Sequence, residues 1–148
     1  MISKIWKSAA AGALVLFASV TVLPVATAQA AIVAKVDLSQ QRMHVFVNGK
    51  RRYSWRVSTG KRGWRTPTGY YTPSKLYKNY YSKRWRMRMP YTVVISTAGY
   101  AIHGTMATGK LGRPASHGCI RLHPSNAKTF FYLVASHGKW NTSVQVVR

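Results

Sequence analysis

Ser116-His117-Gly118-Cys119-Ile120-Arg121-Leu122 is the stretch on which the interpretation of this chain depends. It holds the only cysteine, with a histidine two residues before it and a glycine between the two. A second histidine, His103, lies upstream in Ala101-Ile102-His103-Gly104-Thr105. One thiol with histidines available to deprotonate it is the composition of a cysteine nucleophile site. The alternative is a buried, inert cysteine, but the flanking glycine and polar residues favour a tight, exposed turn.

These residues resemble the signature of the L,D-transpeptidase catalytic domain family (YkuD-type) of bacterial cell walls, in which a His-Gly pair precedes the cysteine motif. Thr66-Pro67-Thr68-Gly69 and Met89-Pro90-Tyr91 resemble two further elements of the family. Asn126 departs from the family pattern, because the family usually has an acidic residue at this position, just before the alanine of the following helix. The resemblance spans residues 33–148. It implies a mostly β, β-sandwich-like domain with one substantial α-helix after the cysteine motif.

The resemblance also implies a two-step acyl transfer. The Cys119 thiolate attacks the peptide bond after the third residue of a peptidoglycan stem tetrapeptide, D-Ala leaves, and an amine of a neighbouring stem resolves the thioester. Family likeness makes His103 the base, although spacing alone also permits His117. The backbone N–H groups around Gly118 and Cys119 are the expected oxyanion donors, and His117 and Arg121 are expected to organise the turn or bind a substrate carboxylate. The full set with an implied oxyanion or substrate-binding role is Gly104, Ser116, His117, Gly118 and Arg121. Neither a metal nor an organic cofactor is expected.

The charge balance is extreme. Asp37 is the only carboxylate side chain, against 23 Lys and Arg. A glycosidase normally needs two carboxylates and a calcium or magnesium site needs several oxygen ligands, so both classes are excluded. The single cysteine excludes an intramolecular disulfide and a Cys-rich zinc site. The positive field favours anionic partners, which for an exported protein are cell-envelope polymers rather than nucleic acid.

Residues 1–30 have the pattern of a signal peptide. Lys4 and Lys7 precede an apolar run over 9–25, and Ala28-Gln29-Ala30 supplies small residues for cleavage. A transmembrane anchor is the alternative, which the interrupting Pro24 and the cleavage pattern disfavour. We therefore expect an exported protein, periplasmic or associated with the cell wall, whose catalytic domain occupies residues 31–148.

Alternating apolar residues predict strands over 33–37 and 42–47, and a return strand through Tyr53, Trp55 and Val57. Asn48-Gly49 between the last two is typical of a type I′ hairpin turn. Further strands are expected to begin at residue 70 and to cover 91–97, 100–103 and 143–147. A helix is predicted from a cap in Pro124-Ser125-Asn126 to Gly138. Its apolar face consists of Ala127, Phe130, Phe131 and Val134.

Residues 75–88 interleave lysines and arginines with tyrosines and a tryptophan. Such a segment can stack on sugar rings while its charges hold anions. The other interpretation is a solvated basic loop whose aromatic stems pack on the core.

Three alternatives to a transpeptidase remain on sequence grounds. A water acceptor gives an L,D-carboxypeptidase or endopeptidase, and the amine of an envelope protein gives an enzyme that attaches proteins to peptidoglycan. A non-catalytic, basic cell-wall-binding module is the alternative from another class. The free thiol within an intact motif argues against this last alternative.

Overall fold

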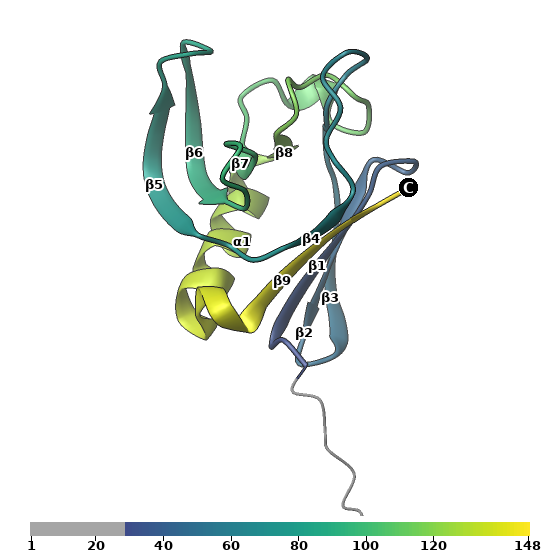
Figure 1. Ribbon diagram of the computed structural model, residues 1–148, viewed down its shortest axis with the longest axis vertical. Helices are drawn as coiled ribbons and strands as arrows, with labels where there is room; N and C mark the ends of the chain where they lie inside the picture. The colour runs from purple at the N-terminus through teal and green to yellow at the C-terminus, as the bar shows by residue number, and fades with distance from the viewer. Residues whose placement is uncertain (1–28) are drawn as a thin grey trace, which may run out of the picture.

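The computed structural model describes residues 29–148, so nearly all of the expected signal peptide at residues 1–30 lies outside the described residues. The described chain forms two β-sheets and one α-helix (Figure 1). This arrangement confirms the mostly β, sandwich-like fold class.

The first sheet has the strand order β3-β2-β1-β9-β4. Its strands β1 and β9 pair in parallel, and all its other neighbours are antiparallel. At the turn between β2 and β3, Asn48 and Gly49 both have positive φ, 49° and 77°, as a type I′ turn requires. The predicted hairpin is therefore confirmed. The strands are β1 (Ile32–Asp37), β2 (Arg42–Val47), β3 (Lys50–Arg56), β4 (Gly69–Tyr71) and β9 (Thr142–Val147).

The second sheet has the order β5-β6-β7-β8, and β7 and β8 are parallel. Its first two strands form a hairpin over residues 75–94, so the interpretation of residues 75–88 as a loop is wrong. The aromatic residues of this segment favour strands, and pairing with residues 87–94 completes the ladder, so the strand expected over 91–97 begins earlier than predicted. The strands are β5 (Lys75–Ser82), β6 (Met87–Val94), β7 (Ala101–Gly104) and β8 (Ile120–Leu122).

Helix α1 (Pro124–His137) buries the four predicted apolar residues against β6 and β7. Its N-cap is His123 rather than a residue of Pro124-Ser125-Asn126, because the His123 ring accepts the backbone N–H of Ser125. Two short 3-10 helices, η1 (Thr108–Lys110) and η2 (Lys139–Asn141), complete the secondary structure. No helix within residues 29–148 is long and apolar enough to cross a membrane.

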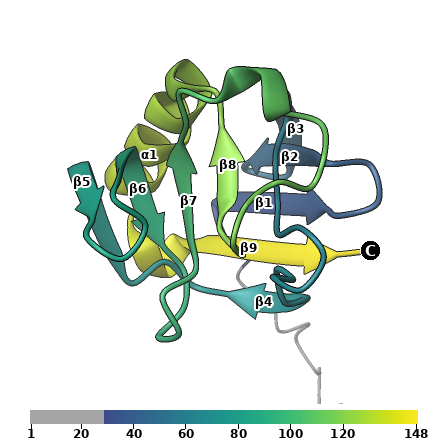
Figure 2. The same cartoon turned by 90° about the horizontal axis from the view of Figure 1, so that it is seen from above.

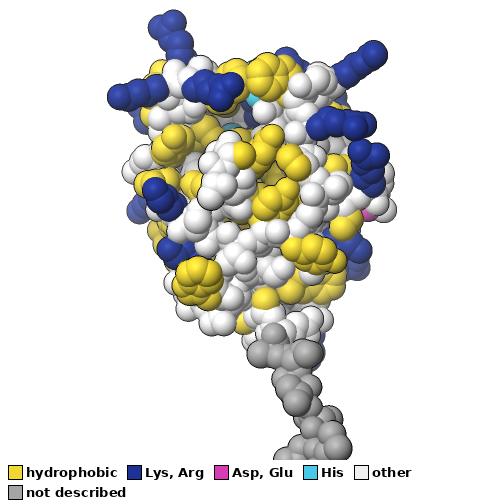
Figure 3. Space-filling view, viewed as in Figure 1, with side chains coloured by type: hydrophobic (Ala, Val, Ile, Leu, Met, Phe, Trp, Pro, Cys, Tyr) yellow, Lys and Arg dark blue, Asp and Glu magenta, His cyan; other side chains and the backbone are white. Residues whose placement is uncertain are grey.

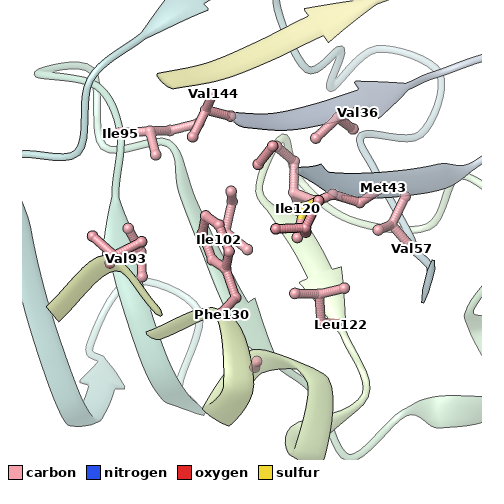
Figure 4. Packing of buried hydrophobic residues seen from close by; sticks show 14 of the residues in the cluster. Val36, Met43, Val57, Val93, Ile95, Ile102, Ile120, Leu122, Phe130 and Val144 are labelled. Atoms are coloured by element: carbon pink, nitrogen blue, oxygen red, sulfur yellow. The ribbon is translucent and has the colours of Figure 1, made fainter. Parts of the chain in front are cut away.

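The core lies where the two sheets and α1 meet. Seen from above, β7 and β8 lie side by side next to α1, and β1 and β9 run across them (Figure 2). Ile120 points among residues of both sheets, while Leu122 and Phe130 fill the space beside the helix (Figure 4). Ile120 and Leu122 are both fully buried, and each such side chain stabilises the fold by roughly 1.5–3 kcal/mol. The chain immediately after Cys119 is thereby anchored in the core.

Candidate active site

Parallel pairing of β7 and β8 brings the two halves of the motif together. His103 lies opposite Arg121 in the register, and Cys119 directly precedes β8. On its other side, Arg121 exchanges two backbone hydrogen bonds with Ser58, so this strand is fixed at both edges. The result is one small cavity, called here the cysteine pocket. It is lined by Trp85, Met87, Met89, His103, Ser116, His117, Cys119 and Arg121.

Residues 116–119, called here the cysteine turn, are shaped by hydroxyl groups. Ser116 Oγ donates to the Cys119 carbonyl at 2.5 Å and accepts the Gly118 N–H at 3.0 Å. Thr66 Oγ1 donates to the Gly118 carbonyl at 2.8 Å. Gly118 has a φ of 117°, and an added Cβ would lie 2.5 Å from the Tyr100 ring, so a side chain is excluded here. Ser116 and Thr66 therefore hold the backbone that presents Cys119.

His103 is almost completely enclosed in the pocket, with 1% of its surface exposed. Its Nδ1 lies 2.7 Å from the Gly104 carbonyl. Because a carbonyl only accepts, Nδ1 carries the proton and Nε2 is left as the acceptor. Burial lowers the pKa of His103 to about 4, although the Gly104 carbonyl acts in the opposite direction and Arg121 adds to the decrease. His103 is accordingly a neutral base with a defined tautomer at pH 7.

Gly104 contributes to the site through its backbone. An added Cβ would lie 3.0 Å from Pro90 Cγ and 3.2 Å from Pro124 Cα, so the two prolines enclose this residue. The carbonyl that orients His103 is thereby held in place.

Cys119 is half-buried, and its environment acts on the thiol in both directions. Burial raises the pKa of Cys119, whereas a hydrogen bond from the Ala101 backbone and the charge of Arg121 lower it. Burial is the largest of the three and the net pKa is raised. The resting pair at neutral pH is therefore a thiol beside a neutral imidazole.

Arg121 is a buried cation, with only 8% of its surface exposed. Burial lowers its pKa, and the Cys119 side chain raises it. Among the described residues, its Nε atom has no hydrogen-bond partner. A buried guanidinium without a carboxylate is costly unless an anion approaches it. Its position beside Cys119 suits a thiolate or the carboxylate of a ligand.

Two tryptophans that were not predicted as site residues contact His117: Trp85, which lines the pocket, and Trp64, which packs against both. The His117 ring stacks on Trp85 with centroids 4.1 Å apart and an interplanar angle of 3°. Trp64 meets His117 edge-on at 5.0 Å and Trp85 at 5.4 Å. Burial lowers the pKa of His117, followed by the charges of Lys61, Arg121 and Arg84. Under this cover the pocket has a volume of about 20 Å³, enough for one water molecule.

The structure thus gathers most of the predicted site residues in one place. His103, Ser116, His117, Cys119 and Arg121 all line the pocket. Gly104 and Gly118 do not line it and act through their backbone atoms. Trp85 lies in the basic-aromatic segment and Thr66 in the Thr-Pro-Thr-Gly element that resembles the family, so both had a sequence signal, whereas Trp64 had none. Residues 29–148 contain no group of three His, Cys, Asp or Glu that could hold a metal ion.

Comparison with known proteins identifies the fold. Residues 31–146 match the family model of the L,D-transpeptidase catalytic domain. An L,D-transpeptidase from Mycobacterium smegmatis superposes with a TM-score of 0.72 at 20% identity, covering 80% of this chain and 59% of that one. One from Mycobacterium tuberculosis gives 0.70 at 23% identity, covering 80% and 58%. The L,D-transpeptidase from Stackebrandtia nassauensis gives 0.70 at 27% identity, covering 82% and 57%. The chain thus spans less than two thirds of the length of these structures. No curated protein sequence matches it significantly.

Proposed function

Because the chain belongs to the L,D-transpeptidase catalytic domain family, we propose that it catalyses acyl transfer on peptidoglycan stem peptides through a Cys119 acyl-enzyme. The observation that carries this proposal is the enclosed pairing of the single thiol with His103. The Nδ1 proton of His103 is committed to Gly104, so Nε2 is available to accept the thiol proton. A binding module has no need for a thiol and an oriented base in one pocket.

In the acylation step, the Sγ–H proton moves to His103 Nε2 as Sγ bonds to the carbonyl carbon of the stem tetrapeptide. The tetrahedral intermediate then collapses, and the D-Ala amine leaves with the proton from His103. An amine of a second stem attacks the thioester carbonyl and gives up a proton to His103. The C–S bond then breaks, and the proton passes from His103 to Sγ, which restores the Cys119 thiol. The raised pKa of Cys119 and the lowered pKa of His103 favour proton transfer during the attack rather than before it.

The oxyanion of the intermediate needs a donor in the cysteine turn. The Gly118 N–H already donates to Ser116 Oγ, so we assign this role to the Cys119 N–H. Arg121 supplies positive charge beside the developing thiolate or binds a carboxylate of the stem. Gly104 and Ser116 serve as positioning residues in this scheme, because one orients His103 and the other shapes the turn.

The acceptor defines the other candidate activities. Water in place of an amine gives an L,D-carboxypeptidase or endopeptidase, and an amine of an envelope protein gives protein attachment. All three use the same residues, so only the product separates them. The non-catalytic, basic wall-binding module is disfavoured by the burial of His103 and Arg121 around the thiol.

Mass spectrometry of a purified disaccharide-tetrapeptide after incubation with the protein tests the proposal. A crosslinked dimer with loss of D-Ala indicates transpeptidation, and a tripeptide alone indicates hydrolysis. Cys119→Ala should abolish both products, and Cys119→Ser should be nearly as inactive because a hydroxyl ionises far less readily. His103→Ala should reduce acylation by roughly 10²–10⁴-fold. His137→Ala, on the surface of α1, is the control. Crosslinking by Cys119→Ala would contradict the nucleophile assignment.

Covalent labelling by a carbapenem gives an independent readout, because its strained ring mimics the acyl donor. The intact mass of wild type should increase by one carbapenem, whereas the mass of Cys119→Ala should stay unchanged. An adduct on both proteins would place the reactive group elsewhere.

Export is part of the same proposal, since the stem peptides lie outside the cytoplasm. We expect cleavage after Ala30 of the signal peptide at residues 1–30. Amino-terminal sequencing of the protein from the envelope fraction should begin at Ala31, and a chain that begins at Met1 would contradict cleavage.

A further inference from the structure

Two basic segments, remote in sequence, meet at one end of the molecule. One is the segment 61–65, and the other is the turn of the β5–β6 hairpin at 83–86. Trp64 of the first segment contacts Trp85 of the second at 5.4 Å, and both contact His117 of the cysteine turn. Six exposed cations stand on these segments and are called here the basic rim. They are Lys61, Arg62, Arg65, Lys83, Arg84 and Arg86.

The space-filling view shows Lys and Arg side chains projecting from this end of the molecule, with histidine atoms visible between them (Figure 3). The cysteine pocket lies beneath, because Trp85 and His117 line it as well as joining the two segments. The two segments that carry the basic rim therefore flank the pocket, although Arg65 also lines a separate cavity beside Arg148.

The rim cations have no carboxylate side chain beside them within residues 29–148, and among them only Arg65 shares a cavity with the carboxy-terminal residue, Arg148. Asp37 is the only carboxylate side chain in the chain, and its Oδ1 accepts hydrogen bonds from Ser39 Oγ at 2.6 Å and the Gln40 N–H at 2.9 Å. Of the rim residues, Arg84 contacts the Trp85 ring, with its Cζ 4.9 Å from the centroid. One cation of the cluster is thus stabilised by an aromatic ring, and an external anion would relieve the repulsion among all six.

The backbone beneath the rim is ordered by packing. Stacking of Trp85 on His117 ties the hairpin turn to the cysteine turn, and Trp64 ties the other segment to both. Cations placed on a supported backbone lose less conformational freedom on binding than cations on a mobile tail. Several fixed charges at neighbouring positions suit a ligand with repeated charges better than a single small anion.

We propose that the basic rim binds a linear polyanion of the cell envelope and holds it across the entrance of the cysteine pocket. The recognised chemistry is a chain of repeated phosphate or carboxylate groups. Single-stranded nucleic acid shares the charge but also needs free aromatic faces for its bases. Trp85 is stacked on His117, whereas Trp64 and Tyr81 keep 40% and 54% of their surface exposed, so single-stranded DNA is included among the probes. The export proposed above favours the envelope polymer. This binding does not require the transfer reaction, so its test is independent of the proposed function.

The test compares two triple variants in which the same residue types, one Lys and two Arg, are changed to Gln. The control cations are exposed at the start of β3, at the opposite end of the molecule from the β5–β6 turn (Figure 1). Both variants lose the same net charge, so any difference between them reports position. The rim variant is Arg62→Gln, Lys83→Gln and Arg84→Gln, and the control variant is Lys50→Gln, Arg51→Gln and Arg52→Gln.

Binding is measured by fluorescence anisotropy with labelled polyphosphate and labelled polyglutamate, over a series of salt concentrations. Near an anionic surface one cation contributes about fivefold to affinity, so the rim variant should bind on the order of 100-fold more weakly at low salt. Its affinity should also depend less on salt, because fewer charges remain to be screened. The control variant should stay close to wild type. Tighter binding to polyphosphate would indicate that the ligand is a phosphodiester polymer. Tighter binding to polyglutamate would indicate that it is a carboxylate polymer. Both outcomes support the proposal.

Equal losses in the two variants would overturn the proposal, because only total charge would then matter. Much tighter binding to single-stranded DNA of equal charge would also overturn it and assign the rim to nucleic acid. Thermal unfolding of both variants checks that they fold as wild type does, and Cys119→Ala should bind both probes as wild type does.

Discussion

Acidification should destabilise the folded protein through His103, and His103→Gln should remove that part of the loss. His103 is buried beside Arg121, and its pKa falls from 6.5 to about 4 in the folded protein. The unfolded chain therefore takes up a proton as the pH drops through 6.5, whereas the folded protein takes it up only near pH 4. The contribution of His103 to the free energy of unfolding is constant above pH 6.5 and declines as the pH falls from 6.5 to about 4.

The size of the effect follows from the pKa shift. The difference between the two pKa values corresponds to roughly 3 kcal/mol of unfolding free energy, which is lost in full once the pH is below both values. At pH 4.5 most of this loss, roughly 2–3 kcal/mol, should already be present. The Gln side chain can still donate to the Gly104 carbonyl but does not titrate.

Urea denaturation near pH 7 and near pH 4.5 measures the loss in each protein. Between these pH values wild type should lose roughly 2–3 kcal/mol more unfolding free energy than His103→Gln. The pKa values of His44 and His117 are also lowered, mainly by burial, but both residues remain in the variant and cancel in the comparison. His137→Gln is the matched control and should lose as much as wild type. The same pH-dependent loss in wild type and His103→Gln would refute the reasoning.

Three further predictions concern the cysteine turn. Because burial raises the pKa of Cys119, the rate of alkylation by iodoacetamide should keep increasing as the pH rises above neutral. A rate that is already high and constant from near pH 6 would instead indicate a preformed thiolate. Gly118→Ala forces a side chain into a positive φ against the Tyr100 ring and should cost at least about 1–3 kcal/mol in urea denaturation, whereas Gly109→Ala, whose Cβ meets nothing within 4 Å, should cost far less. Equal costs for the two glycines would contradict the packing argument. Thr66→Val removes the donor to the Gly118 carbonyl and should cost about 1–3 kcal/mol and slow carbapenem acylation, while Thr66→Ser keeps the hydroxyl and should acylate normally.

Local patterns in the chain predicted much of the fold. The Asn48-Gly49 turn joins two alternating segments, and its positive φ values follow from the residues themselves. The apolar spacing of α1 likewise identified its buried face before any packing was known. Residues 75–88 were misjudged because their exposed charges hide a strand whose pairing depends on residues 87–94. The N-cap was displaced to His123 because a ring nitrogen, rather than the Asn126 side chain, accepts the free N–H.

Some features of the active site could likewise be predicted from the sequence, and others could not. The lone cysteine, its motif and the upstream His-Gly pair were visible in the sequence because nucleophile chemistry needs specific residue types. The bond from Thr66 to Gly118 joins residues 52 apart, and the cover of Trp64 and Trp85 over His117 joins three separate segments. Neither contact leaves a periodic or compositional trace.

Residue types and short-range geometry were enough to predict the family, the reactive thiol and the positions of the local turns. The surroundings of the thiol, in contrast, follow from long-range packing. The parallel register of β7 and β8 places His103 and Arg121 beside Cys119, and burial there sets the direction of all three pKa shifts. Such shifts depend on the exclusion of water by residues from many parts of the chain, which no local stretch of sequence contains.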